Sequence, residues 1–464
     1  MPEMPQELMQ RLRAHKQEHV LSWWDEIGQA GQENLIHQLK GIDFARLREL
    51  YRFRDQAQTL PPLNSIKPAP IDRLDKKDQK KKQQGEDALR RGEVAVLMVA
   101  GGQGSRLGFD HPKGMFPIGP VSQRSLFQIH AEKVLALSRK YGKGIPFLVM
   151  TSLATDAETQ AFFQDNQFFG LPGEEVHFFQ QGTMPALDLE TGKLLMEAKD
   201  RLFLSPNGHG GTLTALMSSG LLNSLERQGI RYIFYFQVDN PLVQIADPRF
   251  LGHHLEHAAE ASSKAIPKDG PHDRLGNFVE LDGRCLIIEY SDLPETMASL
   301  KDDKGQLRFR AGSPAIHWFN LDFLKRVTKG QGSMPYHIAR KKVPYMNAQG
   351  ESVHPASENA LKFELFIFDA LPLADRWTIV ETSRKTEFAP LKNADGADSA
   401  DAVRQALSNL AGGWLDRAGV SVPREADGNV AVAIEVSPLY ALNAADLAAK
   451  ITKDMKIAGP TCLG

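Results

Sequence analysis

The chain has 464 residues, of which 42% are hydrophobic and 24% are charged. This length exceeds what one hydrophobic core usually organises, so we expect a large central domain with smaller flanking domains. The composition is too apolar for a disordered chain. A net charge of -2 excludes a global field that would draw the molecule onto nucleic acid or anionic lipid, so any charged ligand must be bound by local groups.

The cysteines and the amino terminus bear on the cellular compartment. Cys285 and Cys462 lie far apart and have no cysteine or histidine neighbours at metal-site spacing, which excludes a disulfide framework. The first residues lack the uninterrupted apolar core of a secretory signal, and no apolar run of about 18 residues follows. We therefore expect a cytoplasmic protein with no membrane partner.

The amino-terminal part of the chain is predicted to be helical. Apolar residues recur there at roughly helical spacing among charged ones, namely Leu8, Leu12, Leu21, Trp24 and Ile27. This pattern favours an amphipathic helix over residues 5–27, and we assign residues 1–90 to a helical amino-terminal domain. The lysine run at 76–82 follows a proline-rich stretch and is predicted to be a solvated helix face, because no aromatic residues interleave it as they would in a nucleic-acid site.

A doubly wound α/β domain is predicted to begin at Val94. The apolar run 94–100 ends in glycines, as a buried parallel strand would. Ser125 opens a capping-box pattern and an apolar-periodic segment that reaches about Tyr141, and residues 147–150 follow as a second strand. This alternation predicts a mostly parallel sheet whose ligands bind beyond the carboxyl ends of its strands.

The carboxy-terminal part differs in composition from the centre. Near Asn393 the sequence changes to stretches rich in alanine and aspartate, with one strand-like run at 430–436. We therefore assign residues 91–392 to the central domain and residues 393–464 to a small carboxy-terminal domain.

The first predicted strand runs into a glycine-rich loop at residues 101–108, and Lys113 follows. Glycines let backbone N–H groups approach a polyphosphate, whose oxygens Arg106 and Lys113 would neutralise. A Walker loop is excluded because no Gly-Lys-Ser/Thr follows at the required spacing. The dinucleotide fingerprint fits poorly, since the glycines follow G-x-G-x-x-x-G and no acidic residue ends a second strand at the usual place. A tight strand-to-loop turn is the alternative.

The segment LMVAGGQGSRLGFDHPKGMFPIG resembles the signature of the eukaryotic-type UDP-sugar pyrophosphorylases, which include UDP-N-acetylhexosamine and UDP-glucose pyrophosphorylases. The similarity continues through FFQQGTMPALD, SPNGHGGTLTAL, YFQVDNPLVQIADPRFLG, IIEYSDLP, KKVPYMNAQG, KFELFIFDALP and the run from Arg384 to Asn393. It covers most of residues 94–410, and the N-acetylhexosamine branch is closer in overall pattern. The resemblance implies a Rossmann-like nucleotide-diphospho-sugar transferase fold with a mixed, mostly parallel sheet.

The resemblance assigns the nucleotide to two glycine loops and one glutamine. Gln181 would read the uracil, because a glutamine amide can pair with both a donor and an acceptor on the base edge, and a buried structural glutamine is the alternative. The second loop, at 206–211, precedes a helix-like segment at 212–228 and offers backbone donors at a helix N-terminus. The implied nucleotide-binding residues are Ala100, Gly101, Gly102, Gly104, Gln181, Pro206 and Gly208.

The implied metal-binding and catalytic residues are charged. The apolar run 233–238 ends in Asp239, which would hold Mg²⁺ because this ion is often bound by one carboxylate together with phosphate oxygens and waters. A helix N-cap is the alternative role for this aspartate. Lys392 matches the lysine that reaches the phosphate region in the family, and the catalytic cations are Arg106, Lys113 and Lys392.

Sugar contacts are implied for His209, Gly276 and Glu289, of which the glutamate would accept hydrogen bonds from hydroxyls. The N-acetylhexosamine enzymes usually carry asparagine where this chain has His209, and histidine there is typical of the glucose enzymes. They also have asparagine at Ser313 and Ile316, the latter a sugar contact. Losing that contact costs ~1–3 kcal/mol, enough to change sugar preference. N-acetylglucosamine 1-phosphate and glucose 1-phosphate therefore rank nearly equal, with galactose 1-phosphate behind.

The implied reaction is in-line attack of a sugar 1-phosphate oxygen on the α-phosphorus of UTP, which releases pyrophosphate and leaves a UDP-sugar. It needs no covalent enzyme intermediate, and positioning and cations would supply the catalysis. Two alternatives stay open. One is a catalytically weak UDP-sugar-binding or regulatory protein on the same fold, and the other is a nucleotidyltransferase that uses a different base. The oligomeric state cannot be read from the sequence.

Overall fold

The computed structural model describes residues 4–56, 62–74, 78–329, 334–452 and 455–464. The chain packs into two compact units. Unit 1 comprises Met1–Leu60, Gln181–Thr214 and Ser333–Asp369, and unit 2 comprises Pro61–Gln180, Ala215–Gly332 and Ala370–Gly464. The boundaries of these units differ from the predicted domain boundaries near residues 90 and 392, which stay predictions.

One large sheet organises unit 2. Among the described residues it has twelve strands in the order β1-β13-β15-β12-β16-β11-β3-β4-β5, with β14 beside β13, β21 beside β12 and β2 beside β21. The strands are β1 Lys67–Pro68, β2 Asp72–Arg73, β3 Val94–Val99, β4 Phe147–Thr151, β5 Val176–Gln180, β11 Tyr232–Gln237, β12 Ala261–Pro267, β13 Asn277–Leu281, β14 Arg284–Ile288, β15 Ala311–Gly312, β16 His317–Asn320 and β21 Trp377–Glu381. The β11-β3-β4-β5 part is parallel, and β16 joins it antiparallel. The predicted mixed α/β sheet is confirmed.

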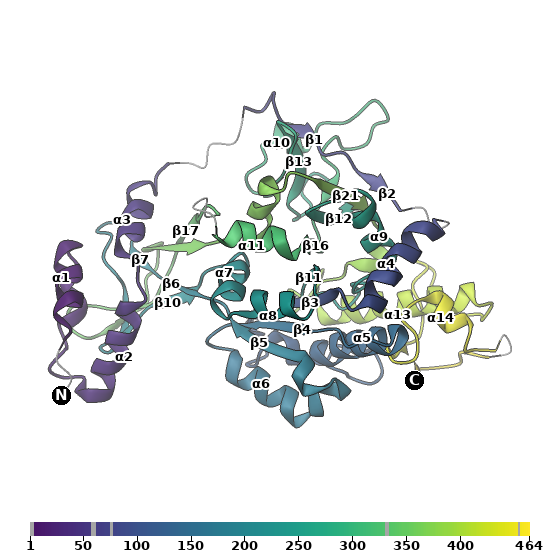
Figure 1. Ribbon diagram of the computed structural model, residues 1–464, viewed down its shortest axis with the longest axis horizontal. Coiled ribbons are helices and arrows are strands. Elements are labelled where there is room, and N and C mark those ends of the chain that lie inside the picture. The colour runs from purple at the N-terminus through teal and green to yellow at the C-terminus, as the bar shows by residue number, and fades with distance from the viewer. Residues whose placement is uncertain (1–3, 57–61, 75–77, 330–333, 453–454) are drawn as a thin grey trace. The chain divides into compact units, whose positions relative to one another are not determined.

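Helices cover both faces of this sheet, as two successive side chains of strand β16 show. On one face the ring of Trp318 lies 6.4 Å from that of Phe250, which belongs to α9. On the other face the ring of Phe319 stacks 6.1 Å from that of Phe323 in α11. Because successive side chains of a strand point to opposite faces, β16 is buried between the two helices. Figure 1 shows α5 and α6 together on one side of β3, β4 and β5.

The helices of unit 2 follow its strands in chain order. They are α4 Gln79–Arg91, α5 Leu126–Tyr141, α6 Asp156–Asp165, α8 Leu221–Arg227, α9 Pro248–Glu256, α10 Glu295–Ala298, α11 Leu321–Lys329, α12 Arg384–Glu387, α13 Ala400–Arg417 and α14 Ala444–Ala448. The predicted start of α5 is confirmed, because the Ser125 hydroxyl accepts a hydrogen bond from the N–H of Gln128 at the helix N-terminus. Its end at Gly142, with φ 68°, is a left-handed cap that favours glycine.

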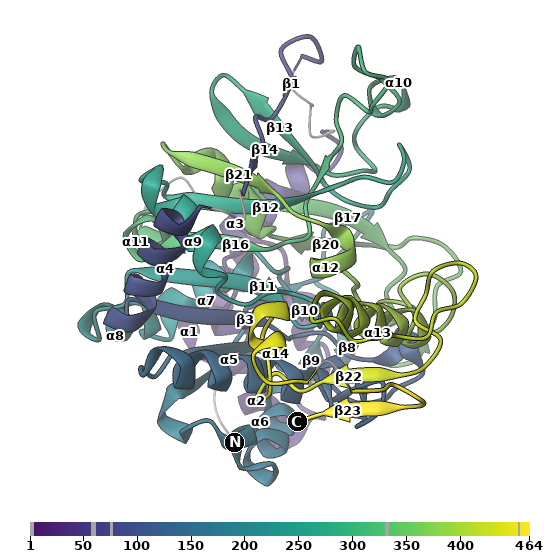
Figure 2. The ribbon, with the colours of Figure 1, turned by 90° about the vertical axis from the view of Figure 1, so that its right-hand side faces the viewer.

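Helices α4 and α9 pack unusually close together, and they lie side by side in Figures 1 and 2. A side chain at Gly85 would place its Cβ 1.9 Å from the carbonyl oxygen of Pro248, and one at Gly252 would place it 1.8 Å from that of Lys81. Lys81 belongs to the predicted lysine face and pairs with Glu256 at 3.0 Å rather than with solvent alone. Lys76 and Lys77 of that run lie outside the described residues.

Unit 1 joins the amino-terminal helices to strands from two later segments. The helices are α1 Gln6–Ala14, α2 Gly28–Lys40 and α3 Phe44–Arg52, and the strands are β6 Thr183–Pro185, β7 Leu187–Asp188, β8 Met196–Ala198, β9 Arg201–Leu202, β10 Leu204–Pro206, β17 His337–Lys341, β18 Tyr345–Met346, β19 Ser352–Val353 and β20 Ala360–Glu364. Their shared core contains Leu12, Leu39 and Leu47 of the helices together with Leu202 and Phe363 of the strands.

Two predicted helices are interrupted. The predicted helix over 5–27 is wrong in length, because α1 ends at Ala14, where Lys16 takes a left-handed φ of 57°, and a short 3₁₀ turn follows at Glu18–Leu21. The segment 212–228 is split into α7 Gly211–Ser218 and α8 by Gly220, which has φ 76°. In both places one residue of positive φ redirects the chain.

The carboxy-terminal part of unit 2 has a small apolar core of its own, which includes Leu415, Val430, Ile434 and Leu447. The predicted strand at 430–436 is shorter than expected: β22 Ile434–Val436 pairs in parallel with β23 Thr461–Leu463. The described residues contain no helix long and apolar enough to cross a membrane.

Candidate active site

The glycine loop after β3 folds back on itself through backbone hydrogen bonds. The N–H of Gly104 donates to the carbonyl of His111 at 2.9 Å, and that of Lys113 donates to Gly102 at 3.0 Å. A Cβ at Gly104 would lie 2.7 Å from the carbonyl oxygen of Phe109, and Gly108 has φ 66°, so both glycines are needed for the turn itself. Gly102 is different: it is exposed, and a Cβ there would meet nothing within 4 Å. Packing does not require glycine there, whereas close approach of a phosphate would.

The structure brings Lys113 and Asp239 together. Strands β3 and β11 are parallel neighbours with Val99 opposite Gln237, so the loops that follow them leave the same edge of the sheet at the same level. The Nζ of Lys113 lies 3.9 Å from Oδ2 of Asp239. This separation exceeds a hydrogen bond, so both groups keep capacity for a ligand. Both side chains are partly exposed, at 19% and 13%.

A third segment, Arg384–Lys392, is fastened to the end of β11 by the residue after the aspartate. Asn240 is buried, its side-chain N–H donates to the carbonyl of Glu387 at 2.7 Å, and its side-chain oxygen accepts the N–H of Ala389 at 3.1 Å. The N–H of Leu391 then donates to the backbone carbonyl of Asp239 at 2.8 Å. Lys392 therefore follows directly on a residue that is bonded to the aspartate.

The charges around this edge influence one another. Burial raises the pKa of Asp398, while Lys392 opposes this rise and Asp239 adds to it. The N–H of Lys392 donates to the carbonyl of Asp398 at 2.8 Å. Arg106 is exposed, and its guanidinium makes no ion pair or hydrogen bond with any residue that the structure describes. The sheet edge thus carries three cationic side chains of the predicted set with little internal neutralisation.

A buried ion pair lies beneath this third segment. The Nζ of Lys264 donates to both carboxylate oxygens of Glu387, at 2.5 and 2.6 Å, and Thr382 donates to Oε1 at 3.0 Å. Burial raises the pKa of Glu387, and the neighbouring ammonium opposes that rise. A buried charge that loses its partner is strongly destabilising, so this pair fixes α12 on strand β12.

Helix α5 supports the loop that carries Asp239. His130 is fully buried and donates from Nε2 to the carbonyl of Val238 at 2.9 Å. One turn later, Lys133 donates to the carbonyls of Pro241 and Val243 at 2.5 and 2.9 Å. Burial lowers the pKa of Lys133 to about 7 and that of His130 to about 3. Asp239 therefore lies between backbone carbonyls that accept hydrogen bonds from α5, that of Val238 before it and those of Pro241 and Val243 after it.

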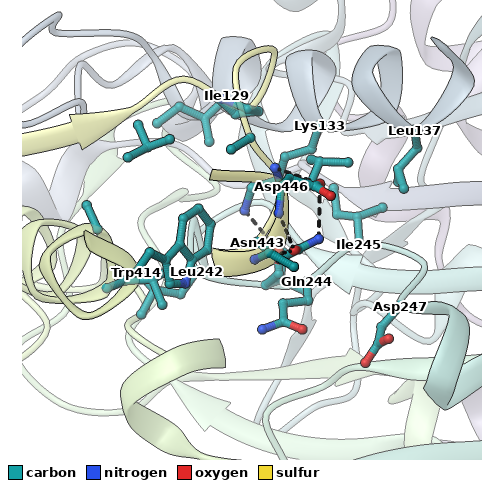
Figure 3. A pocket seen from close by; sticks show the side chains of 18 of the residues that line it. Ile129, Lys133, Leu137, Leu242, Gln244, Ile245, Asp247, Trp414, Asn443 and Asp446 are labelled. Atoms are coloured by element: carbon teal, nitrogen blue, oxygen red, sulfur yellow. Dashed lines mark hydrogen bonds between the residues drawn. The ribbon is translucent and has the colours of Figure 1, made fainter. Parts of the chain in front are cut away.

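An apolar cavity of about 230 Å³ lies behind the same loop. Figure 3 shows Lys133 among the side chains that line it, together with Leu242 of the loop and Trp414 of α13. Lys140 of α5 pairs with Asp446 at 2.9 Å. The cavity walls thus combine the Asp239 loop with the carboxy-terminal helices.

The predicted sugar residues of unit 2, Gly276 and Glu289, lie beside each other at the end of the β13–β14 hairpin. A Cβ at Gly276 would lie 2.5 Å from Cγ2 of Ile287 and 3.5 Å from Oε1 of Glu289. Ile316 is not at an open surface: it is 1% exposed, it belongs to the main core, and its carbonyl accepts the N–H of Lys264 at 3.0 Å. In this structure its side chain contributes to packing.

Four other predicted residues belong to unit 1 and form a second group: Gln181, Pro206, Gly208 and His209. Gln181 is buried and its side-chain amide donates to the carbonyl of Gly208. Gly208 has φ 83°, and a Cβ there would lie 2.3 Å from the carbonyl oxygen of Leu365. Pro206 ends β10 opposite Thr183 of β6. The glycine at 208 is therefore required by conformation and by packing.

His209 is held in one tautomer. Its Nδ1 accepts the N–H of Ile367 at 3.2 Å, so the neutral ring carries its proton on Nε2 and is a donor there. Burial lowers the pKa of His209 to about 4, and His337 contributes in the same direction. The ring stacks 5.3 Å from that of Phe366. At neutral pH the ring is uncharged and carries its N–H on Nε2.

Comparisons with known proteins agree with this arrangement. The family model described as UTP--glucose-1-phosphate uridylyltransferase matches residues 43–410. The chain belongs to this family. It is 36% identical to UDP-N-acetylglucosamine diphosphorylase 2 of Arabidopsis thaliana over 94% of this chain and 89% of the relative. It is 36% identical to UDP-N-acetylglucosamine pyrophosphorylase of Saccharomyces cerevisiae over 86% of this chain and 88% of the relative.

A solved structure of the uridine diphosphate N-acetylglucosamine pyrophosphorylase of Trypanosoma brucei, in complex with an inhibitor, superposes with a TM-score of 0.82. The two sequences are 30% identical, and the match covers 97% of this chain and 95% of that one. The predicted membership of the UDP-sugar pyrophosphorylases is confirmed.

Sequence reasoning about this uridylyltransferase family member missed the residues that hold the site in place. Asn240 directly follows the predicted metal ligand and could have been noticed for its position. His130, Lys133 and Lys264 carry no such signal, because they come from a helix and a strand distant in sequence and look like ordinary core-facing or surface residues. Their roles follow from the contacts described above.

Proposed function

We propose that this protein transfers UMP from UTP to a sugar 1-phosphate and releases pyrophosphate, with the phosphates bound at the carboxyl edge of β3 and β11. One observation carries the proposal: Lys113 after β3, Asp239 after β11 and the Lys392 segment are brought together there by register and by hydrogen bonds. An exposed glycine with open space beside it adjoins them. Family membership supports the same activity.

The chain's own residues would act by positioning and by electrostatics. Both substrates are anions, so the sugar phosphate oxygen can approach the α-phosphorus of UTP only if cations screen their repulsion. Lys113 and Lys392 are proposed to bind the phosphates of the two substrates, and Arg106 to bind the leaving pyrophosphate. The attacking oxygen forms a bond to the α-phosphorus as the bond to the β-phosphate bridging oxygen breaks, and no side chain becomes covalently modified.

Asp239 is the proposed ligand of a divalent cation, Mg²⁺. Its carboxylate fits such an ion because the nearest cation of the described residues, Lys113, stands 3.9 Å away and leaves the oxygens open to another partner. Oxygen ligands at the edge of a phosphate loop are what Mg²⁺ prefers. When bound, the ion would neutralise phosphate charge and stabilise the charge that develops on the leaving group.

Base and sugar recognition are proposed for the other predicted residues. Gln181 and the backbone of Gly208 would contact the uracil, and Ala100, Gly101, Gly104 and Pro206 would complete the nucleotide contacts. Glu289, Gly276 and His209 would contact the sugar. A cytoplasmic location stays a prediction from the sequence.

We propose N-acetylglucosamine 1-phosphate as the preferred acceptor. Relatives that carry this sugar in their names match at 36% identity, whereas a UDP-glucose phosphorylase structure of Trypanosoma brucei matches at 19%. Glucose 1-phosphate is the second candidate, because histidine at position 209 is typical of the glucose enzymes.

The test is pyrophosphate release by the purified chain with UTP, Mg²⁺ and one sugar 1-phosphate at a time: N-acetylglucosamine, glucose or galactose. The proposal expects the highest kcat/KM with the N-acetylglucosamine substrate. A higher value with glucose 1-phosphate would overturn the sugar assignment alone. Binding of UDP-sugar without pyrophosphate release from any of the three would favour the rival binding protein, and replacing UTP by TTP or ATP tests the base.

A further inference from the structure

A cluster of two histidines and one aspartate lies in unit 2 and shares no residue with the candidate active site. His253 and His257 stand one turn apart on α9, the second as its carboxy-terminal cap, and Asp72 belongs to β2. The Oδ2 of Asp72 lies 3.2 Å from Nε2 of His253 and 3.8 Å from Nε2 of His257. One donor atom from each of the three residues lies within 4.8 Å of the other two.

The hydrogen bonds of His257 make its Nε2 an acceptor. Its Nδ1 lies 3.0 Å from the carbonyl of His253, and a carbonyl can only accept, so Nδ1 carries the proton. The neutral ring then points the lone pair of Nε2 toward a carboxylate oxygen, which is also an acceptor. Two facing lone pairs repel unless a positive group lies between them. A backbone carbonyl behind a histidine nitrogen is also how metal-binding histidines are usually oriented.

The two imidazole rings of the cluster lie 4.2 Å apart by ring centroids, and His253 is 2% exposed, so the cluster is compact and partly buried. Lys81 also faces the cluster, but it is paired with Glu256 at 3.0 Å and with Asp78 at 3.5 Å. A single divalent cation between the three side chains would bind the Nε2 atoms of both histidines and the carboxylate of Asp72 at once.

The spacing suits a small tetrahedral ion. Bonds of about 2.0 Å to nitrogen and oxygen imply edges of about 3.3 Å between ligand atoms, close to the two distances from Asp72. Imidazole nitrogen selects Zn²⁺ and its transition-metal neighbours, whereas Mg²⁺ prefers oxygen ligands and six-fold coordination. The Thr378 hydroxyl on β21 lies 3.0 Å from the same Nε2 of His253 and donates to Oδ2 of Asp72 at 3.4 Å, so it borders the proposed ion and would stay bonded to the carboxylate.

We propose that Asp72, His253 and His257 bind one Zn²⁺-type ion, with water in the fourth position, and that this ion ties strand β2 to helix α9. Asp72 pairs with Val380 of β21, the strand that leads into the Arg384–Lys392 segment, and α9 packs against α4. The ion is structural, because it would join two elements, strand β2 and helix α9, and uses none of the residues assigned to phosphate binding.

Cobalt titration of the full chain, carried without an affinity tag and stripped of metal by a chelator, tests the proposal. We expect one Co²⁺ per chain with the visible absorption of a tetrahedral site, displaced by Zn²⁺ but not by excess Mg²⁺. His257→Ala should weaken Co²⁺ binding at least ~10-fold. This side chain is 41% exposed, so its removal spares the core.

His272→Ala is the matched control. This exposed histidine also faces a carboxylate, Glu295 at 3.6 Å, and is not part of the three-residue cluster. The control should bind Co²⁺ as the unaltered chain does, and Asp72→Asn should weaken binding as His257→Ala does. In thermal unfolding without nucleotide, Zn²⁺ should raise the Tm of the unaltered chain and of the control alone. Absence of the tetrahedral band, or equal binding by His257→Ala and His272→Ala, would overturn the proposal.

Discussion

The two groups of predicted site residues differ in how far the protein itself satisfies them. In unit 2, Lys113 and Asp239 stop 3.9 Å apart, and Arg106 meets no charged partner among the described residues. In unit 1, Gln181 already donates to Gly208, and His209 already accepts from Ile367. Charges left without close partners are suited to a charged ligand, whereas groups bonded internally are suited to shape and orientation. We therefore propose catalysis for the first group and recognition for the second.

The largest expected effect comes from the charged group. Lys113→Ala should lower kcat for pyrophosphate release about 10³-fold, because it removes a cation placed beside the phosphates. Lys143→Ala, an exposed lysine after α5, is the control and should retain full activity. Circular dichroism and the Tm should be unchanged in both variants. Near-normal turnover of the first variant would remove Lys113 from the mechanism.

Asp239→Asn should lower kcat about 10²-fold and raise the Mg²⁺ concentration that gives half-maximal activity, because the amide is a weaker ligand for a hard cation. The backbone carbonyl that accepts from Leu391 is retained, so the Tm should change little. A variant with an unaltered Mg²⁺ dependence would show that the carboxylate holds no metal.

Asn240→Ala should lower kcat roughly tenfold with a smaller change in KM, since it frees the segment that places Lys392. It breaks two buried hydrogen bonds, to Glu387 and Ala389, and should cost about 1–3 kcal/mol of unfolding free energy. Asn240→Asp keeps the acceptor for Ala389 but turns a carboxylate oxygen toward the carbonyl of Glu387, so it should not restore the activity. If both variants lose stability but keep kcat, the residue is merely structural.

The smallest effect on activity is expected at His130, whose substitution should change the pH dependence of stability. Burial lowers the pKa of His130 to about 3, below the 6.5 of an exposed histidine, so below pH 6.5 the unfolded chain binds a proton that the folded chain does not. The free energy of unfolding should therefore fall as the pH drops from 6.5 toward 3. His130→Gln keeps a donor for Val238 without titrating, and should flatten this fall by at most about 1.4 kcal/mol per pH unit. Parallel urea titrations at several pH values measure it, and identical slopes would contradict the assignment.

Much of the central sheet could be predicted from the sequence because its strands are buried on both faces. The run Val94–Val99 is apolar throughout, as a central parallel strand requires. Ser125 is a typical N-cap residue, and its hydroxyl does cap the start of α5. The role of the glycine loop is harder to predict, since glycines can serve either a tight turn or the close approach of a phosphate. Only the structure separates Gly104, which the turn needs, from Gly102, which it does not.

The parts that could not be predicted depend on contacts between distant segments. The amino-terminal helices share a core with strands around Leu202 and Phe363, far along the chain, and no local pattern reveals this. The ends of the first helix and of the helix after Gly211 depended on single residues of positive φ, one of them a lysine. Likewise, the hydrogen bond from His130 to the carbonyl of Val238, next to Asp239, comes from helix α5, which is distant in sequence from β11.

The central claim is that the sheet edge after β3 and β11 binds the phosphates of the nucleotide. A crystal structure of the chain soaked with UTP and Mg²⁺ tests it most directly. The account predicts triphosphate density against Gly101 and Gly102, within hydrogen-bonding distance of Lys113, with the metal on Asp239. Triphosphate density at any other place on the molecule, with this edge empty, would contradict it.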